Sequence, residues 1–159
     1  VGLGKTHLMH AVGNEILNSS PEKRIVYVHS EKFVADMVKA LQLGAMSEFK
    51  SFYRNADALL IDDIQFFAGK EQSQEEFFHT FNSLMEKGSQ IVISADRPPM
   101  KLDRVQERIK SRFSGGLVVD IQKSDYELRR KIVEHKINEL DNLYTIRDSL
   151  PYFFTRLRM

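Results

Sequence analysis

The sequence contains no cysteine among its 159 residues. Disulfide bonds and thiolate metal sites are therefore excluded, and this absence is typical of proteins from a reducing compartment. The chain also lacks an apolar run of the roughly 20 residues that a membrane-spanning helix requires. Its first residues lack the apolar stretch of a signal peptide. Together these absences predict a soluble, cytoplasmic protein.

An excess of charge of one sign is also missing. The 23 basic residues nearly balance the 22 acidic residues, which leaves a formal net charge of +1. Overall charge therefore gives no argument for binding nucleic acid, and any such contact must be local. The hydrophobic content of 42% fits an ordinary globular protein, and the length allows one domain with a sizeable core.

Segments typical of strands alternate with segments typical of helices. This order predicts an α/β fold in which helices flank a parallel sheet. Strands are expected at residues 25–28, 58–61, 91–93 and 117–121, and helices at residues 5–18, 33–41, 49–53, 77–85, 102–113 and 128–140. Ser73 with Glu76, and Ser124 with Glu127, have the spacing of a capping box, so each pair is expected at the start of a helix.

A glycine-containing loop opens the chain, with Gly2, Gly4, Lys5 and Thr6 in the order of the end of a phosphate-binding Walker A motif. Glycines let backbone N–H groups approach phosphate oxygens, and the following helix directs the positive end of its dipole at them. Lys5 can reach the β and γ phosphates, and the Thr6 hydroxyl is a suitable Mg²⁺ ligand. Taken alone, the loop could also be a glycine turn that precedes an ordinary helix.

An apolar run at residues 58–61 ends abruptly in Asp62 and Asp63. A buried parallel strand that delivers carboxylates to its carboxyl end has this pattern, and ligands of open α/β sheets bind at that edge. As a Walker B motif, Asp62 would hold Mg²⁺, and Asp63 would orient or deprotonate the attacking water. A solvated strand end is the alternative, which the glycine loop upstream makes much less favourable.

Three further residues follow the third expected strand. Asp96 would lie at the same sheet edge, near a γ phosphate, although an aspartate here can also cap a turn. Arg108 and Arg112 are four residues apart and share one helix face, which suits guanidinium groups that reach the phosphates of a neighbouring molecule. Without further context, a solvated basic face is the favoured interpretation, because charge runs on helices are usually surface features.

The order GLGKTH, ALLIDDIQFFAGKEQSQEEFFHTFNSL, VISADRPP and ERIKSRF closely resembles the AAA+ ATPase domain of the bacterial replication initiator family DnaA. The resemblance runs from Val1 to about Leu140, and IDDIQFFAGKE followed by QEEFFHTFN is far more specific than the Walker motifs. It implies a P-loop NTPase fold of the AAA+ type. Because Val1 opens the chain without a strand ahead of the glycine loop, we expect that the chain is truncated and that the first strand is missing.

The same resemblance implies a division into an AAA+ nucleotide-binding core at residues 1–122 and the start of a helical lid at residues 123–159. The lid is expected to include Leu150, Pro151, Phe153 and Phe154, with shortened spacing. Both parts are expected to be truncated, the core at its N-terminus and the lid at its C-terminus.

The resemblance also assigns roles to residues. It implies that Gly2, Gly4, Lys5 and Thr6 bind ATP or ADP, that Thr6 and Asp62 serve Mg²⁺, that Asp63 serves hydrolysis, and that Asp96 is the sensor 1 residue. Arg112 resembles an arginine finger that contacts ATP on the adjacent subunit, with Arg108 as its companion at the subunit interface. Val38, Lys70 and Ser73 match positions that hold single-stranded DNA, where core, surface and helix-cap roles are the alternatives. At the neighbouring position the family often has arginine, whereas this chain has Gln72.

The implied function is that of a replication initiator in which ATP acts as a slow switch. ATP-bound molecules would self-assemble on origin DNA and help to unwind it, and hydrolysis would reset them. The replicative helicase, through regions outside this sequence, and acidic phospholipids are further candidate partners. A DnaA-related regulator of initiator inactivation or a helicase loader is the alternative. A protein-remodelling AAA+ subunit is disfavoured because residues 69–73 contain no aromatic pore residue.

Overall fold

The computed structural model describes residues 3–140. The chain divides into two compact units, and the boundary along the sequence falls between Asp120 and Ile121. The elements of the first unit, in chain order, are α1 (Lys5–Ser19), β1 (Ile25–His29), α2 (Ser30–Leu43), α3 (Met46–Arg54), β2 (Ala58–Asp62), the 3-10 helix η1 (Ile64–Phe67), α4 (Glu71–Lys87), β3 (Gln90–Ile93), the 3-10 helix η2 (Pro99–Lys101) and α5 (Glu107–Ser114). The second unit contains α6 (Tyr126–Leu140).

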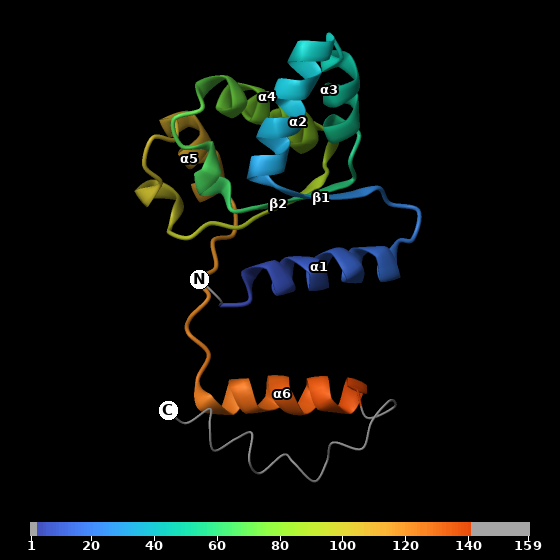
Figure 1. Cartoon of the computed structure of the whole chain (residues 1–159), viewed down its shortest axis with the longest axis vertical. Coiled ribbons are helices and arrows are strands. Elements are labelled where there is room, and N and C mark those ends of the chain that lie inside the picture. The colour runs from blue at the N-terminus through green and yellow to red at the C-terminus, as the bar shows by residue number, and fades with distance from the viewer. Residues whose placement is uncertain (1–2, 141–159) are drawn as a thin grey trace. The chain divides into compact units, whose positions relative to one another are not determined.

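The sheet of the first unit is parallel and has the order β1-β2-β3 (Figure 1). Val28 pairs with Ile61, which in turn pairs with Ile93. Every residue of β2 is buried because this strand has a neighbour on each edge and helices on both faces. The apolar runs at 25–28, 58–61 and 91–93 therefore form strands, as the sequence predicts.

The helices of this unit cover the sheet from both sides. Figure 1 shows α1 along one face and α2, α3 and α4 along the other. Because side chains alternate along a strand, Leu60 packs with Met9 of α1, whereas Leu59 and Ile61 belong to the core on the opposite face. That opposite core is rich in aromatic rings. Phe33 is fully buried at its centre, with ring centroids 4.7–5.9 Å from those of Phe49, Tyr53, Phe67 and Phe77.

The strand expected at residues 117–121 is wrong. The described part of this segment forms no strand, and Leu117 and Val119 expose 93% and 68% of their surface. A strand needs a hydrogen-bonding neighbour along its length. Within the described sheet β3 pairs only with β2, and residues 117–121 do not run beside either of them. The apolar pattern alone was therefore insufficient.

Both expected capping boxes are also wrong. In the first, the Gln74 N–H donates to the Lys70 carbonyl over 2.9 Å, so α4 begins at Glu71 and Ser73 lies buried inside its first turn. The helix itself forms, and its apolar face buries Phe77 and Phe81.

The second capping box is displaced by one residue. Asp125 accepts a 2.8 Å hydrogen bond from the Leu128 N–H, so Asp125 rather than Ser124 caps α6. Along this helix, Leu128 and Ile132 remain about half exposed. The residues expected to begin a helical lid, 150–154, lie outside the described part of the chain, and so does Gly2.

The helix expected at residues 102–113 forms only in its second half. Pro99 begins η2, and Arg104 adopts a positive φ of 54°, which interrupts regular helix before α5. Leu102 and Val105 instead lie in the irregular connection, where both are buried in the core. Both side chains therefore attach a loop to the core instead of forming part of a helix.

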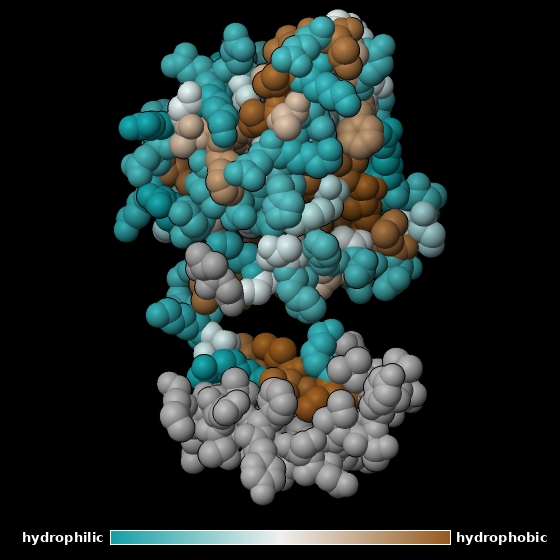
Figure 2. All heavy atoms as spheres, viewed as in Figure 1, coloured by the Kyte–Doolittle hydropathy of each residue, from teal (hydrophilic) through white to brown (hydrophobic). Residues whose placement is uncertain are grey.

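On the face shown in Figure 2, hydrophobic residues reach the surface over α2 and α3. Leu41 and Leu43 of α2 and Phe52 of α3 are among the exposed hydrophobic side chains. Within residues 3–140, none of the helices has the length and apolar character needed to cross a bilayer.

Candidate functional site

The start of α1 meets the carboxyl end of β2. Asp62 is the last residue of β2 and is fully buried. It lies two residues after Leu60, so strand alternation directs its side chain toward the sheet face that α1 covers. The Thr6 hydroxyl, in the first turn of α1, donates a 2.6 Å hydrogen bond to Asp62 Oδ2. The two sequence motifs therefore meet at one point of the sheet edge.

Gly4 sets the direction in which the chain enters α1. Its φ of 84° and ψ of 14° lie in the left-handed region, which favours glycine. The Gly4 carbonyl accepts the first hydrogen bond of the helix from the Leu8 N–H, over 2.9 Å. The preceding N–H groups of the first turn, including those of Lys5 and Thr6, have no carbonyl partner within α1 and are typical anion donors.

Three side chains donate hydrogen bonds to the Asp62 carboxylate. The Ser94 hydroxyl, just after β3, donates to Oδ1, and the Tyr27 hydroxyl of β1 donates to Oδ2 over 3.1 Å, beside Thr6. Burial raises the pKa of Asp62, but the hydrogen bonds from Ser94, Thr6 and Tyr27 outweigh burial and leave that pKa below its usual value. Asp62 is therefore an ionised carboxylate with a fixed orientation.

Asp63 leaves the strand in a strained conformation. Its φ of 58° and ψ of 54° are left-handed, which costs a non-glycine residue on the order of 1–3 kcal/mol. The Asp63 N–H donates a 3.0 Å hydrogen bond to Ser94 Oγ, and the Ser30 hydroxyl donates a 2.5 Å hydrogen bond to the Asp63 carbonyl. The Gln65 amide donates to Asp63 Oδ1 over 3.0 Å. The Asp63 backbone is thus held on both sides, and its carboxylate is held by Gln65.

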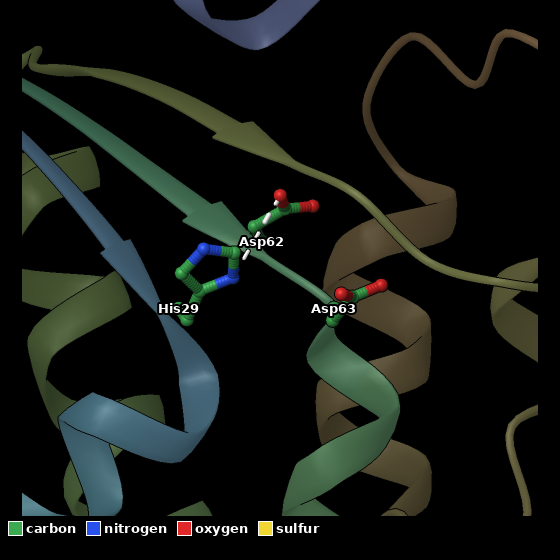
Figure 3. Close-up of side chains that lie close together, drawn as sticks. All are labelled: His29, Asp62 and Asp63. Carbon is green, nitrogen blue, oxygen red and sulfur yellow. Dashed lines mark ion pairs between the residues drawn. The ribbon is translucent and has the colours of Figure 1, made fainter. Parts of the chain in front are cut away.

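His29 ends β1 opposite Asp62 in the strand register. Its Nδ1 atom lies 3.8 Å from Asp62 Oδ2, and ligand atoms of His29, Asp62 and Asp63 lie within 4.8 Å of one another (Figure 3). The hydroxyl and carboxylate oxygens of Thr6 and Asp62 are the donors that Mg²⁺ prefers, whereas an imidazole suits softer divalent metals. The donor set on the α1 side of Asp62 therefore fits Mg²⁺.

Asp96 follows β3 at the same sheet edge. Its backbone N–H donates to Gln65 Oε1 over 3.3 Å, so one glutamine amide links Asp96 to Asp63. Arg97 donates two 3.0 Å hydrogen bonds to the Asp96 carboxylate, from Nε and Nη2. These hydrogen bonds lower the pKa of Asp96, and the charges of Arg97 and Lys5 lower it further. Burial acts in the opposite direction, but the pKa stays below its usual value.

Arg108 and Arg112 both lie on α5. The Arg108 guanidinium stacks over the Phe78 ring at 4.6 Å, and its Nε donates to Gln106 over 2.7 Å. Arg112 is exposed and makes no ion pair with any other residue in the range 3–140. The structure therefore places Arg112 on the surface, while Arg108 is anchored.

The residues predicted to hold single-stranded DNA line one groove of about 350 Å³ between α2 and the start of α4. Val38 is 42% exposed, and Lys70 donates to the Phe66 carbonyl over 2.6 Å. Ser73 is buried at the base of this groove, and Gln72 also lines it. A larger hollow of about 450 Å³ lies at Arg24 and Phe52, near the amino end of β1, and has no contact with the carboxylates.

A comparison with known families decides the relationship. The model of the bacterial DnaA ATPase domain matches residues 1–120, which is most of the chain. The chain belongs to the bacterial DnaA ATPase domain family.

Solved structures of DnaA proteins are similar to this chain. Domain III of the Thermotoga maritima replication initiation protein DnaA is 42% identical, with a TM-score of 0.87, over 97% of this chain and 64% of that one. AMPPCP-bound DnaA from Aquifex aeolicus is 42% identical, with a TM-score of 0.81, over 97% of this chain and 47% of that one. A replication initiator DnaA bound to AMPPCP and single-stranded DNA gives the same four values. The chain thus spans about half the length of these last two proteins.

Sequence reasoning about this DnaA-family site missed four of its polar residues: Tyr27, His29, Gln65 and Ser94. His29 and Ser94 follow apolar strand residues directly, so the rule that placed Asp62 at the carboxyl edge could have placed them there too. Tyr27 and Gln65 gave no such signal. Their roles depend on strand register and on the turn at Asp63, which a local pattern does not define.

Proposed function

We propose that this chain is the ATP-binding and ATP-hydrolysing domain of a chromosomal replication initiator that acts in the cytoplasm. The observation that carries this proposal is the 2.6 Å hydrogen bond between Thr6 and Asp62. It joins the helix of a phosphate loop to the carboxylate at the end of a neighbouring strand, as a P-loop nucleotidase requires. Binding of AMPPCP by two DnaA relatives supports an adenine nucleotide as the ligand.

In this proposal, nucleotide phosphates lie against the first turn of α1. The N–H groups after Gly4, together with Gly2 of the loop, donate to phosphate oxygens, and the Lys5 ammonium provides a charge to the β and γ phosphates. Thr6 and Asp62 would hold Mg²⁺, which would supply positive charge to neutralise the phosphates. Three hydrogen-bond donors keep Asp62 ionised and oriented for this purpose.

Hydrolysis is assigned to Asp63, which would orient or deprotonate the attacking water. The Gln65 amide donates to Asp63 Oδ1 and so helps to fix the orientation of this carboxylate. The proposed enzyme is slow, and ATP acts mainly as a switch. Asp96 is assigned to sense the γ phosphate, and the Arg97 guanidinium that binds the Asp96 carboxylate offsets its negative charge there.

Self-assembly is assigned to α5. Arg112 is exposed and would contact ATP bound to the next subunit, with Arg108 nearby at the same interface. Only a γ phosphate gives such an arginine a charge-assisted partner, so assembly would follow the nucleotide state.

Origin DNA is the proposed partner of the groove that Val38, Lys70 and Ser73 line. The relative with bound single-stranded DNA supports this proposal. Gln72 lacks the charge of an arginine, so one phosphate contact fewer is expected and single-strand affinity should be modest. The replicative helicase and acidic phospholipids are assigned to the whole initiator as further partners.

The decisive experiment compares Arg112→Ala with the wild type in the full-length protein. We expect ATP affinity to stay within about twofold, because the arginine acts on a neighbour's nucleotide, and ATP-dependent assembly to be lost. Light scattering with ATP and with ADP measures assembly. Lys32→Ala, which removes an exposed cation of α2, is the matched control and should assemble normally. Unchanged ATP-dependent assembly of Arg112→Ala would refute the proposed switch.

A further inference from the structure

We propose that Tyr27 is a positioning residue that orients the Asp62 carboxylate for the nucleotide-bound divalent cation. This inference rests on the proposed function, because it concerns the same site. It adds a residue from β1, a strand to which neither the Walker motifs nor the family comparison gives a role in nucleotide binding.

The strand register places Tyr27 beside the carboxylate. Tyr27 pairs with Leu60, which lies two residues before Asp62 on β2. Because side chains alternate along a strand, Tyr27, Leu60 and Asp62 all face the side of the sheet that α1 covers. Its ring packs edge-on against His10 of α1, with centroids 4.4 Å apart. The ring is thereby fixed between the sheet and α1, and its hydroxyl reaches Asp62 Oδ2 over 3.1 Å.

The single phenol proton can be assigned from the neighbours. The Tyr27 oxygen lies 3.1 Å from Asp62 Oδ2 and 3.2 Å from His29 Nε2. An ionised carboxylate only accepts hydrogen bonds, so Tyr27 donates to Asp62 and accepts from a His29 Nε2–H. Burial, with the hydrogen bond to Asp62 and the charges of Asp62 and Asp63, raises the pKa of Tyr27 to about 12, so the donor keeps its proton at neutral pH.

The three side chains that donate hydrogen bonds to Asp62 come from different elements and have different roles. Thr6 lies on α1, and its hydroxyl oxygen is itself proposed to hold the cation. Ser94 and Tyr27 lie on the strands to either side of β2, or directly after them, and act on different oxygens of the carboxylate. Together they fix its plane. Without the Tyr27 hydroxyl, Asp62 Oδ2 would keep the hydrogen bond from Thr6 and the 3.8 Å contact with His29 Nδ1.

The test uses Tyr27→Phe in the full-length protein, which removes one oxygen and keeps the ring. Tyr53→Phe is the matched control, because the Tyr53 hydroxyl also donates to an aspartate, Asp36 Oδ2, over 3.1 Å, but in the core on the other sheet face. ATP affinity is measured with excess Mg²⁺ and with EDTA. Loss of a charge-assisted hydrogen bond to Asp62 should lower the Mg²⁺-dependent gain in affinity about tenfold in Tyr27→Phe and leave affinity in EDTA within about twofold. Tyr53→Phe should match the wild type in both conditions.

Two results would overturn the positioning role. In one, Tyr27→Phe keeps the full Mg²⁺-dependent gain; in the other, it loses affinity equally with Mg²⁺ and with EDTA, as a general packing defect would. A double-mutant cycle gives an independent reading, because the effect of Tyr27→Phe should vanish in an Asp62→Asn background, and an effect that persists there would also refute the proposal. A wild type without Mg²⁺-dependent ATP binding would overturn the proposed function itself.

Discussion

Packing of α1 against β2 sets the geometry of the site, and Gly13 is the residue that tests this dependence. Gly13 is buried in α1, and a Cβ atom built on it would lie 3.4 Å from Leu60 Cδ2 of β2. That distance is an ordinary contact for one methyl group and leaves no room for a larger side chain. Gly13→Ala should therefore be tolerated, whereas Gly13→Val should push α1 away from the sheet.

The expected magnitudes follow from helix propensity and from packing. Alanine is favoured over glycine inside a helix by about 1 kcal/mol, so Gly13→Ala should range from neutral to about 1 kcal/mol more stable. Overpacking costs about 1–3 kcal/mol, so Gly13→Val should be less stable by that amount. Because α1 also carries Lys5 and Thr6, its displacement should stretch the Thr6–Asp62 hydrogen bond and lower ATP affinity about tenfold.

Urea unfolding measures the stability of both variants, and equilibrium binding of labelled ATP measures the site. The pair forms its own control, because both substitutions remove glycine at one position and differ only in the size and β-branching of the new side chain. Wild-type stability and ATP affinity in Gly13→Val would refute the reasoning that contact between α1 and β2 positions the phosphate loop.

Two further substitutions test other parts of the structure. Gln65→Glu replaces the 3.0 Å amide donor with a second carboxylate that repels Asp63, so Asp63 should lose its orientation and single-turnover hydrolysis should fall about tenfold while ATP affinity stays the same; unchanged hydrolysis would contradict the role of this contact. The pKa of Asp57 is lowered by the Arg24 N–H and then by Lys87, so the stability that these contacts provide is present above the usual aspartate pKa and is lost as pH falls through the lowered value. Asp57→Asn should therefore lose less stability than the wild type between about pH 5 and pH 3 in urea unfolding, and an equal loss would count against this linkage.

The fold was predictable where a pattern is local and strong. The apolar runs that became β1, β2 and β3 and the amphipathic stretch of α4 all form as expected. The expected strand at 117–121 failed because a strand depends on a neighbour that no local pattern supplies. The capping box at Ser124 failed because the neighbouring Asp125 caps α6 instead, and the box at Ser73 failed because tertiary contacts decide where α4 begins. At α4, the Gln74 side chain bonds the carbonyls of Phe67 and Arg104, which fixes the turn ahead of Ser73.

The candidate site was predictable only in part, for a related reason. The proximity of Thr6 and Asp62 follows from the rule that loops after parallel strands meet at one edge. The donors from Tyr27 and Ser94 depend on which residues face each other across three strands, and that register is set by long-range packing. The left-handed turn at Asp63 was equally hidden, because aspartate adopts this conformation only when neighbours such as Ser30 and Ser94 hold it.

The most direct test of the account is equilibrium binding of labelled ATP to the full-length protein and to its Lys5→Ala variant. The account predicts that the wild type binds ATP and that Lys5→Ala does not, because the point charge on the phosphates is lost while the fold is retained. Lys32→Ala, which removes an exposed lysine from α2, should bind as the wild type does. Normal ATP binding by Lys5→Ala would contradict the claim that the loop before α1 holds a nucleotide.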